Sequence, residues 1–230
     1  MQSFFGIIMK HDKPAGMELL DAMAAAFDHG ATARRIAHGR FGARVMMDPK
    51  LDQQPGKSHY YEDDQAIILC NGRIDPDTSE ADTNKKYLFK SVYKYPFKSL
   101  YKYLLKYIYS APGKIRGDYV IAQFDKRTGK LKLLRDQLGT RPLYYFEGPA
   151  FFAFATEMKA LRALPGTTFQ MDETWIADFL STVQSEKWRT PYAEIRRMLP
   201  GHMLEYDQAV NLKQVWTLEV QEEYNGIDYE

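Results

Sequence analysis

Apolar residues along most of this chain fall into short runs and alternations of strand length, separated by turn residues. Such segments predict strands, and they lie at residues 3–9, 40–47, 65–71, 119–125, 131–135, 143–146, 151–155, 200–206 and 212–218. We expect the segments at 40–47 and 65–71 to be neighbours in one sheet, with Asn71 and Gly72 in a turn that ends the second. The segments within residues 119–135 are expected to form a hairpin.

Other segments place apolar residues three or four positions apart, which is the spacing of a helix that buries one face. They lie at residues 17–27, 157–163 and 173–180, and on both sides of Pro96 within residues 83–117. Pro96 separates two helices because proline lacks an amide donor and its ring clashes with the preceding turn. Six lysines fall every fourth residue from Lys86 to Lys106 in a segment without acidic residues. We expect a solvated face there, although such a face could also attract an acidic peptide or partner.

The order of these elements, strands then helices then strands, lacks the regular alternation of a doubly wound parallel sheet. It predicts an α+β fold of stacked, mainly antiparallel sheets with helices outside. With 230 residues, of which 45% are hydrophobic, the chain can bury a proper core.

Charge and composition exclude several partners. The formal net charge of +1 gives no global reason to bind nucleic acid or an anionic membrane. No stretch approaches the roughly 18 apolar residues of a membrane span, so we expect a cytoplasmic protein. The single cysteine, Cys70, cannot form an internal disulfide, and the five histidines lack the spacing of a zinc site. We therefore expect no metal.

Four short motifs carry the most specific signal. They are LRDQLGTRPLYY at residues 134–145, NGRI at 71–74, FATEMKAL at 154–161 and PGHML at 200–204. Together, and in this order, they resemble the N-terminal glutamine amidotransferase-like domain (class II) of the asparagine synthetase family. The resemblance implies an Ntn-hydrolase-like fold (N-terminal nucleophile), a four-layer αββα sandwich of two mainly antiparallel sheets. The motif residues that we expect to be structural rather than catalytic are Arg135, Asp136, Gly139, Arg141, Glu157 and Lys159.

The resemblance also implies a domain organisation. We expect the amidotransferase-like domain at residues 1–215 and, at 216–230, a linker toward an ATP-dependent synthetase domain on the same or a separate chain. That second domain is marked in this family by an SGG-x-DS pyrophosphate loop, and no such sequence occurs among these 230 residues. ATP and magnesium are therefore expected to bind in the synthetase domain, and no cofactor is expected in this chain.

The opening MQSFFGI resembles the family's Met-Cys-Ser-(apolar)-Phe-Gly-(apolar) opening without a gap and puts Gln2 at the position of the catalytic cysteine. Enzymes of this fold use a free N-terminal cysteine whose α-amine serves as the base. A carboxamide cannot form the thioester, and loss of a nucleophile costs on the order of a million-fold in turnover. Ser3 is displaced by one residue and Cys70 is expected in a buried strand. We therefore predict no catalytic residue and no glutamine hydrolysis.

By the same resemblance, the rest of the glutamine pocket is vestigial. Asn71 and Gly72 match the residues that donate hydrogen bonds to the oxyanion, Asp82 matches the aspartate for the substrate's α-amine, and Arg44 resembles the arginine for its carboxylate. Asn71 and Gly72 could instead form a turn between strands, and Asp82 could be a helix N-cap. For Arg44, the spacing from Arg44 to Asp48 is one residue shorter than the corresponding spacing in the family.

Three functions stay open. Relatives that lost the glutaminase include β-lactam synthetases and lasso-peptide macrolactam cyclases, which activate a carboxylate as an acyl-adenylate and use an amine other than ammonia. The sequence GRID at residues 72–75 resembles that of the lasso cyclases. It favours a scaffold that packs on the synthetase domain and could help to hold a precursor peptide. The alternatives are a glutamine-hydrolysing domain of an asparagine synthetase whose cysteine was replaced by Gln2 through design, and a freestanding binding or regulatory subunit.

Overall fold

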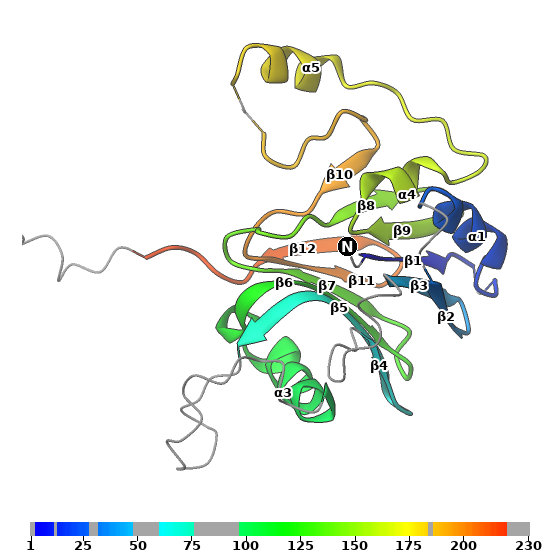
Figure 1. The fold of residues 1–230 in the computed structure, drawn as a ribbon, viewed down its shortest axis with the longest axis vertical. Helices are drawn as coiled ribbons and strands as arrows, with labels where there is room; N and C mark the ends of the chain where they lie inside the picture. Colours follow the sequence, from blue (N-terminus) through cyan, green and yellow to red (C-terminus); the bar gives the residue numbers. More distant parts are fainter. Residues whose placement is uncertain are drawn as a thin grey trace, which may run out of the picture.

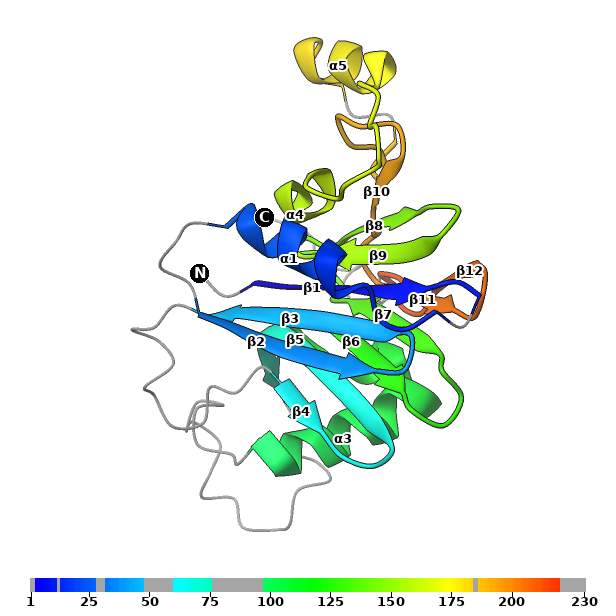
Figure 2. The ribbon, with the colours of Figure 1, turned by 90° about the vertical axis from the view of Figure 1, so that its right-hand side faces the viewer.

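The computed structural model describes residues 3–11, 13–27, 32–47, 60–75, 97–183 and 186–219. Within these ranges two six-stranded sheets stack face to face, and helices lie on both outer sides (Figures 1 and 2). Every strand pairing in them is antiparallel. This is the predicted α+β fold, an Ntn-type αββα sandwich.

The first sheet has the strand order β10-β8-β9-β1-β3-β2 and the second has the order β12-β11-β7-β6-β5-β4. The first sheet consists of β10 Ile195–Arg197, β8 Tyr144–Glu147, β9 Phe151–Ala155, β1 Ser3–Met9, β3 Phe41–Met47 and β2 Thr32–His38. The second sheet consists of β12 Val210–Gln214, β11 His202–Tyr206, β7 Leu131–Arg135, β6 Arg116–Asp125, β5 Ala66–Asp75 and β4 Tyr60–Glu62.

The helices complete the outer layers. Helices α1 (Met17–Ala25) and α4 (Met158–Arg162) contact each other and cover the first sheet, whereas α3 (Phe97–Ser110) covers the second. A 3₁₀ turn, η3 (Pro112–Lys114), follows α3, and α5 (Glu173–Leu180) stands away from the sandwich (Figure 1).

Alternation along each strand explains the layers, because successive side chains point to opposite faces of a sheet. In β1, Phe4 and Ile8 enter the core between the sheets, while Phe5 and Ile7 pack toward α1 and α4. The rings of Phe41 and Phe124 stack with centroids 4.4 Å apart and join the first sheet to the second. Each such fully buried aromatic side chain stabilises the fold by about 1.5–3 kcal/mol.

All nine predicted strands overlap strands of the structure, with ends displaced by a few residues. The helices predicted at 17–27, 157–163 and 173–180, and the one after Pro96, are confirmed as well. The helix expected before Pro96 and residues 220–230 of the predicted linker lie outside the described residues, as do the side chains of the lysine series except Lys106.

Two expectations about the sheets were wrong. The segments at 40–47 and 65–71 are not neighbours, because β3 belongs to the first sheet and β5 to the second. Asn71 and Gly72 do not form a turn, because β5 runs through them to Asp75 and pairs with β6 over its whole length. An apolar run predicts a strand but does not identify its partner, and here tertiary pairing overrides the turn preference of Asn-Gly.

Three strands were missed, namely β2, β4 and β10. β2 (TARRIAH) carries two arginines and a histidine, and β4 and β10 have three residues each. These segments lack the apolar run or the length on which strand prediction depends. All three are edge strands, each paired on one side only within the described residues.

Candidate functional site

The start of β1, next to the predicted nucleophile position, is held by the motif FATEMKAL. The N–H of Phe4 donates to Thr156 Oγ1 at 3.1 Å, and this hydroxyl donates to the Phe4 carbonyl at 3.2 Å. The N–H of Thr156 donates to the same carbonyl at 3.0 Å. Since Thr156 is buried at the end of β9, these bonds fix the main chain of β1 where the strand begins.

Ser3, the residue before Phe4, is held by Glu157 of the same motif, which in turn pairs with Lys159. Ser3 Oγ donates a hydrogen bond to Glu157 Oε1, and Lys159 Nζ lies 3.0 Å from Glu157 Oε2. The Lys159 ammonium also lies 4.5 Å from the ring centroid of Phe27, near the end of α1. Ser3 is buried on the helix-covered side of the first sheet, the side that Phe5 shares, so its hydroxyl does not face the space between the sheets.

Two residues central to the predicted pocket, Gln2 and Asp82, lie outside the described residues, as does Asp48. The other thiol considered as a nucleophile, Cys70, is described and buried in β5 against α3. Burial raises the pKa of Cys70 to about 12, and the smaller effects of Arg141 and Asp118 oppose each other. The thiol is therefore protonated at neutral pH and is a poor nucleophile.

Asn71 and Gly72 sit inside β5, opposite Val120 and Tyr119 of β6. Asn71 continues the face of β5 that carries Leu69 into the core between the sheets, and Arg141 Nη1 donates to Asn71 Oδ1 at 3.4 Å. Gly72 has φ 121°, and a Cβ added there would lie 1.9 Å from the Asp118 carbonyl oxygen. Only glycine therefore lets the two strands approach so closely at this point.

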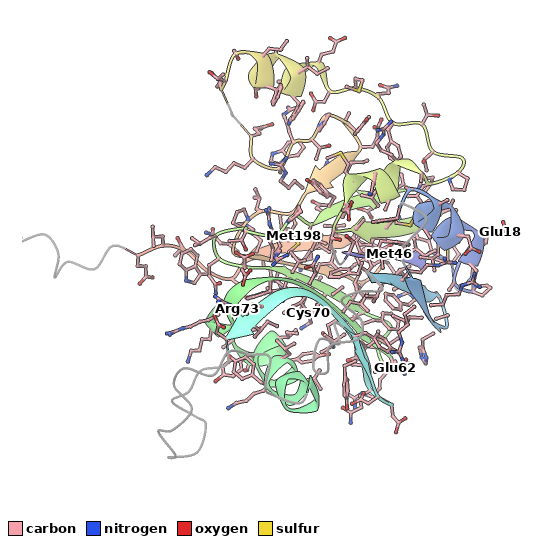
Figure 3. All side chains as sticks on the ribbon, in the orientation of Figure 1. Glu18, Met46, Glu62, Cys70, Arg73 and Met198 are labelled. Atoms are coloured by element: carbon pink, nitrogen blue, oxygen red, sulfur yellow. The ribbon has the colours of Figure 1, made fainter. Side chains whose placement is uncertain are left out.

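A group of charged residues surrounds Asn71 at this end of the second sheet. Asp118 lies 3.3 Å from Arg141 Nη2 and 3.4 Å from Arg73 Nε, and Arg73 Nη2 lies 3.1 Å from Asp75 Oδ2. We call Asn71, Arg73, Asp75, Asp118 and Arg141 the polar end cluster. Figure 3 shows Cys70 and Arg73 on the same strand, with Arg73 nearer its C-terminal end. The two arginines are compensated by the two aspartates, so the cluster has no net charge.

Arg44 is not part of this cluster. Its neighbours in β3, Ala43 and Val45, both enter the core between the sheets, so Arg44 points to the helix-covered face. There its guanidinium pairs with Asp21 of α1, and Arg35 Nη2 lies 3.5 Å from the same carboxylate. Burial lowers the pKa of Arg44. In the described part of the chain, Arg44 therefore ties α1 to the first sheet, and the structure does not bring it together with Asn71 and Gly72.

The motif LRDQLGTRPLYY forms a tight loop that presents Arg141 to the polar end cluster. The buried carboxylate of Asp136 accepts bonds from the Leu138 and Thr140 N–H groups at 3.0 and 3.2 Å, and from Thr140 Oγ1 at 2.9 Å. The Gly201 N–H donates to the Asp136 carbonyl at 2.8 Å, which joins this loop to the motif PGHML. The two motifs are thus one structural unit.

Arg135 closes the same loop from the other side. Its guanidinium donates to the Gly139 and Arg141 carbonyls, each at 2.6 Å, and to the Met198 carbonyl. Burial lowers the pKa of Arg135, and the nearby Asp136 partly offsets this effect. Gly139 has φ 66°, and a Cβ there would lie 3.0 Å from the Arg135 guanidinium. The side chain of Gln137 donates outward instead, to the Gly113 and Ile115 carbonyls at 3.1 and 2.6 Å, and this joins the loop to η3.

Comparison with known proteins identifies this architecture. Residues 36–217 match the family described as glutamine amidotransferase domain. The chain belongs to this family. The matched range covers every part of the polar end cluster and α5. The matched range begins after residue 2. The alignment of Gln2 with the family's catalytic cysteine therefore depends on the opening MQSFFGI.

Curated relatives of this amidotransferase domain are asparagine synthetases. Asparagine synthetase [glutamine-hydrolyzing] 2 of Bacillus subtilis strain 168 is 26% identical over 183 residues, which cover 76% of this chain and 24% of that protein. Asparagine synthetase [glutamine-hydrolyzing] 3 of the same strain is 26% identical over 119 residues, which cover 50% of this chain and 19% of that protein. The chain thus spans about a fifth to a quarter of these relatives.

Solved structures confirm the fold of the amidotransferase domain. Glutamine phosphoribosylpyrophosphate amidotransferase from B. subtilis, complexed with ADP and GMP, matches with a TM-score of 0.51 at 12% identity, over 94% of this chain and 50% of that chain. The structure of an allosteric regulatory enzyme of purine biosynthesis matches with a TM-score of 0.50 at 13% identity, over 94% and 49%. At this identity the likeness concerns the fold alone.

The sequence did not single out Asp118 or Arg73 as members of the amidotransferase domain's polar end cluster. Asp118 belongs to the cluster through a cross-strand contact with Arg73 and a contact with Arg141, whereas Arg73 lies in the motif NGRI and also contacts Asp75 of its own strand. Among the described residues no group of three or more His, Cys, Asp or Glu side chains is arranged to hold a metal ion. No helix in the same ranges is long and apolar enough to cross a membrane.

Proposed function

We propose that this amidotransferase domain does not hydrolyse glutamine and serves as a scaffold in an ATP-dependent amide ligase of the asparagine synthetase kind. The observation that carries the proposal is Gln2, which stands where the family's opening has its cysteine. A carboxamide cannot attack the substrate to form a thioester. The hydrogen bonds that Phe4 donates to Thr156 and Ser3 donates to Glu157 still hold β1 in place without that cysteine.

The two side chains that could replace the cysteine are both unsuited. Ser3 donates its hydroxyl to Glu157 on the helix-covered face, whereas Asn71 lies on the face between the sheets. Cys70 is buried against α3 with a pKa of about 12. An attacking side chain must be accessible to the substrate, and a thiol must also be ionised. Ser3 is buried and lies on the other face from Asn71, and Cys70 is buried and protonated, which supports a silent site.

Within this class we propose a lasso-peptide macrolactam cyclase, in which an amine of the substrate peptide replaces ammonia as the nucleophile. The support is the sequence GRID at residues 72–75, in a strand that carries three members of the polar end cluster. On this proposal ATP and magnesium bind to a synthetase domain, and a precursor peptide is the substrate. This chain lies inside the cell and contributes the surface on which the synthetase domain packs.

A Gln2→Cys variant tests the scaffold proposal. After removal of the initiator methionine has been verified by mass spectrometry, glutamate release is followed with glutamine as substrate. We expect the variant to stay silent, because Arg44 is paired with Asp21 on the helix-covered face and cannot bind the substrate's carboxylate there. Recovery of glutaminase activity would mean an intact pocket. It would favour an asparagine synthetase domain whose cysteine was replaced.

The macrolactam proposal needs a second assay. The chain is combined with its synthetase domain, ATP, magnesium and a precursor peptide, and the products are examined by mass spectrometry. We expect a peptide lighter by one water together with AMP and pyrophosphate, and no requirement for glutamine. Formation of asparagine from aspartate would instead place the chain in an asparagine synthetase. A chain that forms no complex with a synthetase domain would be a freestanding subunit.

A further inference from the structure

Helix α5 has an apolar side that the described chain leaves largely exposed, with Trp175 and Ile176 partly buried. None of its residues is buried. Phe179 and Leu180 are 67% and 76% exposed. The apolar residues Trp175, Ile176, Phe179 and Leu180 follow the spacing that puts them on one side of a helix, and we call them the α5 apolar face. Figures 1 and 2 both show the helix standing away from the two sheets.

The chain nevertheless holds α5 in a defined position. Asp172 caps the helix by accepting the Trp175 N–H at 3.0 Å, and Arg189 Nη1 lies 2.8 Å from the same carboxylate. The Asp172 N–H donates to the Pro191 carbonyl at 2.9 Å. Burial by itself would raise the pKa of Asp172, but the bonds from Trp175 and Arg189 outweigh it and the pKa is lowered. The helix is therefore anchored at its N-terminus, while Phe179 and Leu180 stay exposed along its side.

Such an arrangement is unfavourable for an isolated domain. A helix of eight residues is too short to be stable through its own hydrogen bonds and usually depends on packing of an apolar face. The rings of Trp175 and Phe179 stack with centroids 5.1 Å apart, which gives a broad, flat apolar surface. Met171 and Val183, 54% and 56% exposed, extend it at both ends of the helix. Exposed apolar patches of this kind mark interaction sites.

We propose that the α5 apolar face docks onto the ATP-dependent synthetase domain of the ligase. This inference depends on the proposed function, which supplies that domain. The matched segment covers 24% of the B. subtilis asparagine synthetase 2, so about three quarters of such a protein lies outside the match and can pack against it. The family match at residues 36–217 includes α5, so the helix belongs to the shared domain. Aromatic residues such as Trp175 and Phe179 are enriched in protein interfaces.

Hydrogen exchange of the peptide that covers residues 172–183 tests the proposal. It is measured in the chain alone and in the complete ligase that contains the synthetase domain. We expect exchange to be at least about tenfold slower in the ligase, which corresponds to roughly 1.4 kcal/mol of added protection. Equal exchange in both samples would overturn the proposal. Slow exchange in the chain alone that depends on its concentration would identify a second copy as the occupant and would overturn it too.

Two variants of the ligase separate docking from helix stability. Leu180→Asp puts a charge on the α5 apolar face and is expected to return the exchange to that of the chain alone. Thr174→Asp puts the same charge on the opposite, exposed side of the same helix and is expected to leave the protection unchanged. Equal loss in both variants, or protection that requires a precursor peptide, would contradict docking on the synthetase domain. Glutamate release is assayed on the same samples. Release would contradict the proposed function, whereas the docking of α5 is judged from its hydrogen exchange alone.

Discussion

The hydroxyl of Thr156 and the main chain of Phe4 exchange two hydrogen bonds, one in each direction, at 3.1 and 3.2 Å. This contact joins the end of β9 to the start of β1 and gives the motif FATEMKAL a structural role. The side chain of Thr156 places the strand, while Glu157 fixes Ser3 on the helix-covered face. Both residues of the motif therefore fix the position of β1.

Replacement of Thr156 by valine removes both of these hydrogen bonds while keeping the shape of the side chain. We expect the free energy of unfolding to fall by about 1–3 kcal/mol, because the buried N–H of Phe4 loses this acceptor. Urea unfolding followed by circular dichroism measures the change. Thr128→Val, at an exposed turn position, is the control and should change stability by less than about 0.5 kcal/mol. Equal effects in the two variants would argue against the role of Thr156.

Gly72→Ala should damage the second sheet severely. The new Cβ would meet the Asp118 carbonyl oxygen at 1.9 Å, and φ 121° is unfavourable for any L side chain. We expect a loss of at least about 3 kcal/mol or a failure to fold.

Gly166→Ala is the matched control for this steric prediction. Gly166 also has a positive φ, 72°, but an added Cβ there would meet no atom within 4 Å. The control should cost only the conformational strain, about 1–2 kcal/mol. Thermal unfolding of both variants gives the comparison. Gly72→Ala as stable as Gly166→Ala would show that the two strands do not approach as described.

Cys70 should resist thiol reagents in the folded protein at pH 8, because it is buried and its pKa is about 12. An introduced thiol at an exposed position, Ser181→Cys, should react quickly under the same conditions. The raised pKa also affects stability. The neutral thiol is the form favoured by folding, so its contribution is complete below the ordinary pKa of 9.0 and is lost as the pH rises toward 12. Fast labelling of native Cys70 would contradict the buried placement.

Arg135→Lys should destabilise the loop that carries Arg141. A guanidinium reaches three carbonyls at once, whereas an ammonium on a lysine stem cannot match that fork. We expect a loss of about 3 kcal/mol in the free energy of unfolding. Arg127→Lys, at an exposed turn, should be nearly neutral and is the control. A neutral Arg135→Lys would mean that the loop keeps its shape without these bonds.

The sequence predicted β1, β7 and β9 well because their apolar residues are contiguous and buried. It failed where structure depends on distant partners. Asn71-Gly72 suggested a turn, yet pairing with β6 carries the strand through. The placement of Arg44 could have been deduced, since Ala43 and Val45 on either side are apolar and alternation sends Arg44 to the other face. The placement of Asp118 could not, because its partners Arg73 and Arg141 are both far away in the sequence.

Glutamate release from the purified, unmodified chain tests the central claim most directly. Glutamine is added at a concentration well above that used by active glutaminases, and glutamate is followed by an enzyme-coupled assay beside a sample without protein. We predict release equal to the background, because the proposed function puts Gln2 in the place of the nucleophile, Ser3 and Cys70 are buried, and the Cys70 thiol is protonated at neutral pH. Release above background that disappears in Ser3→Ala or Cys70→Ala would contradict this account and identify the residue that replaced the cysteine.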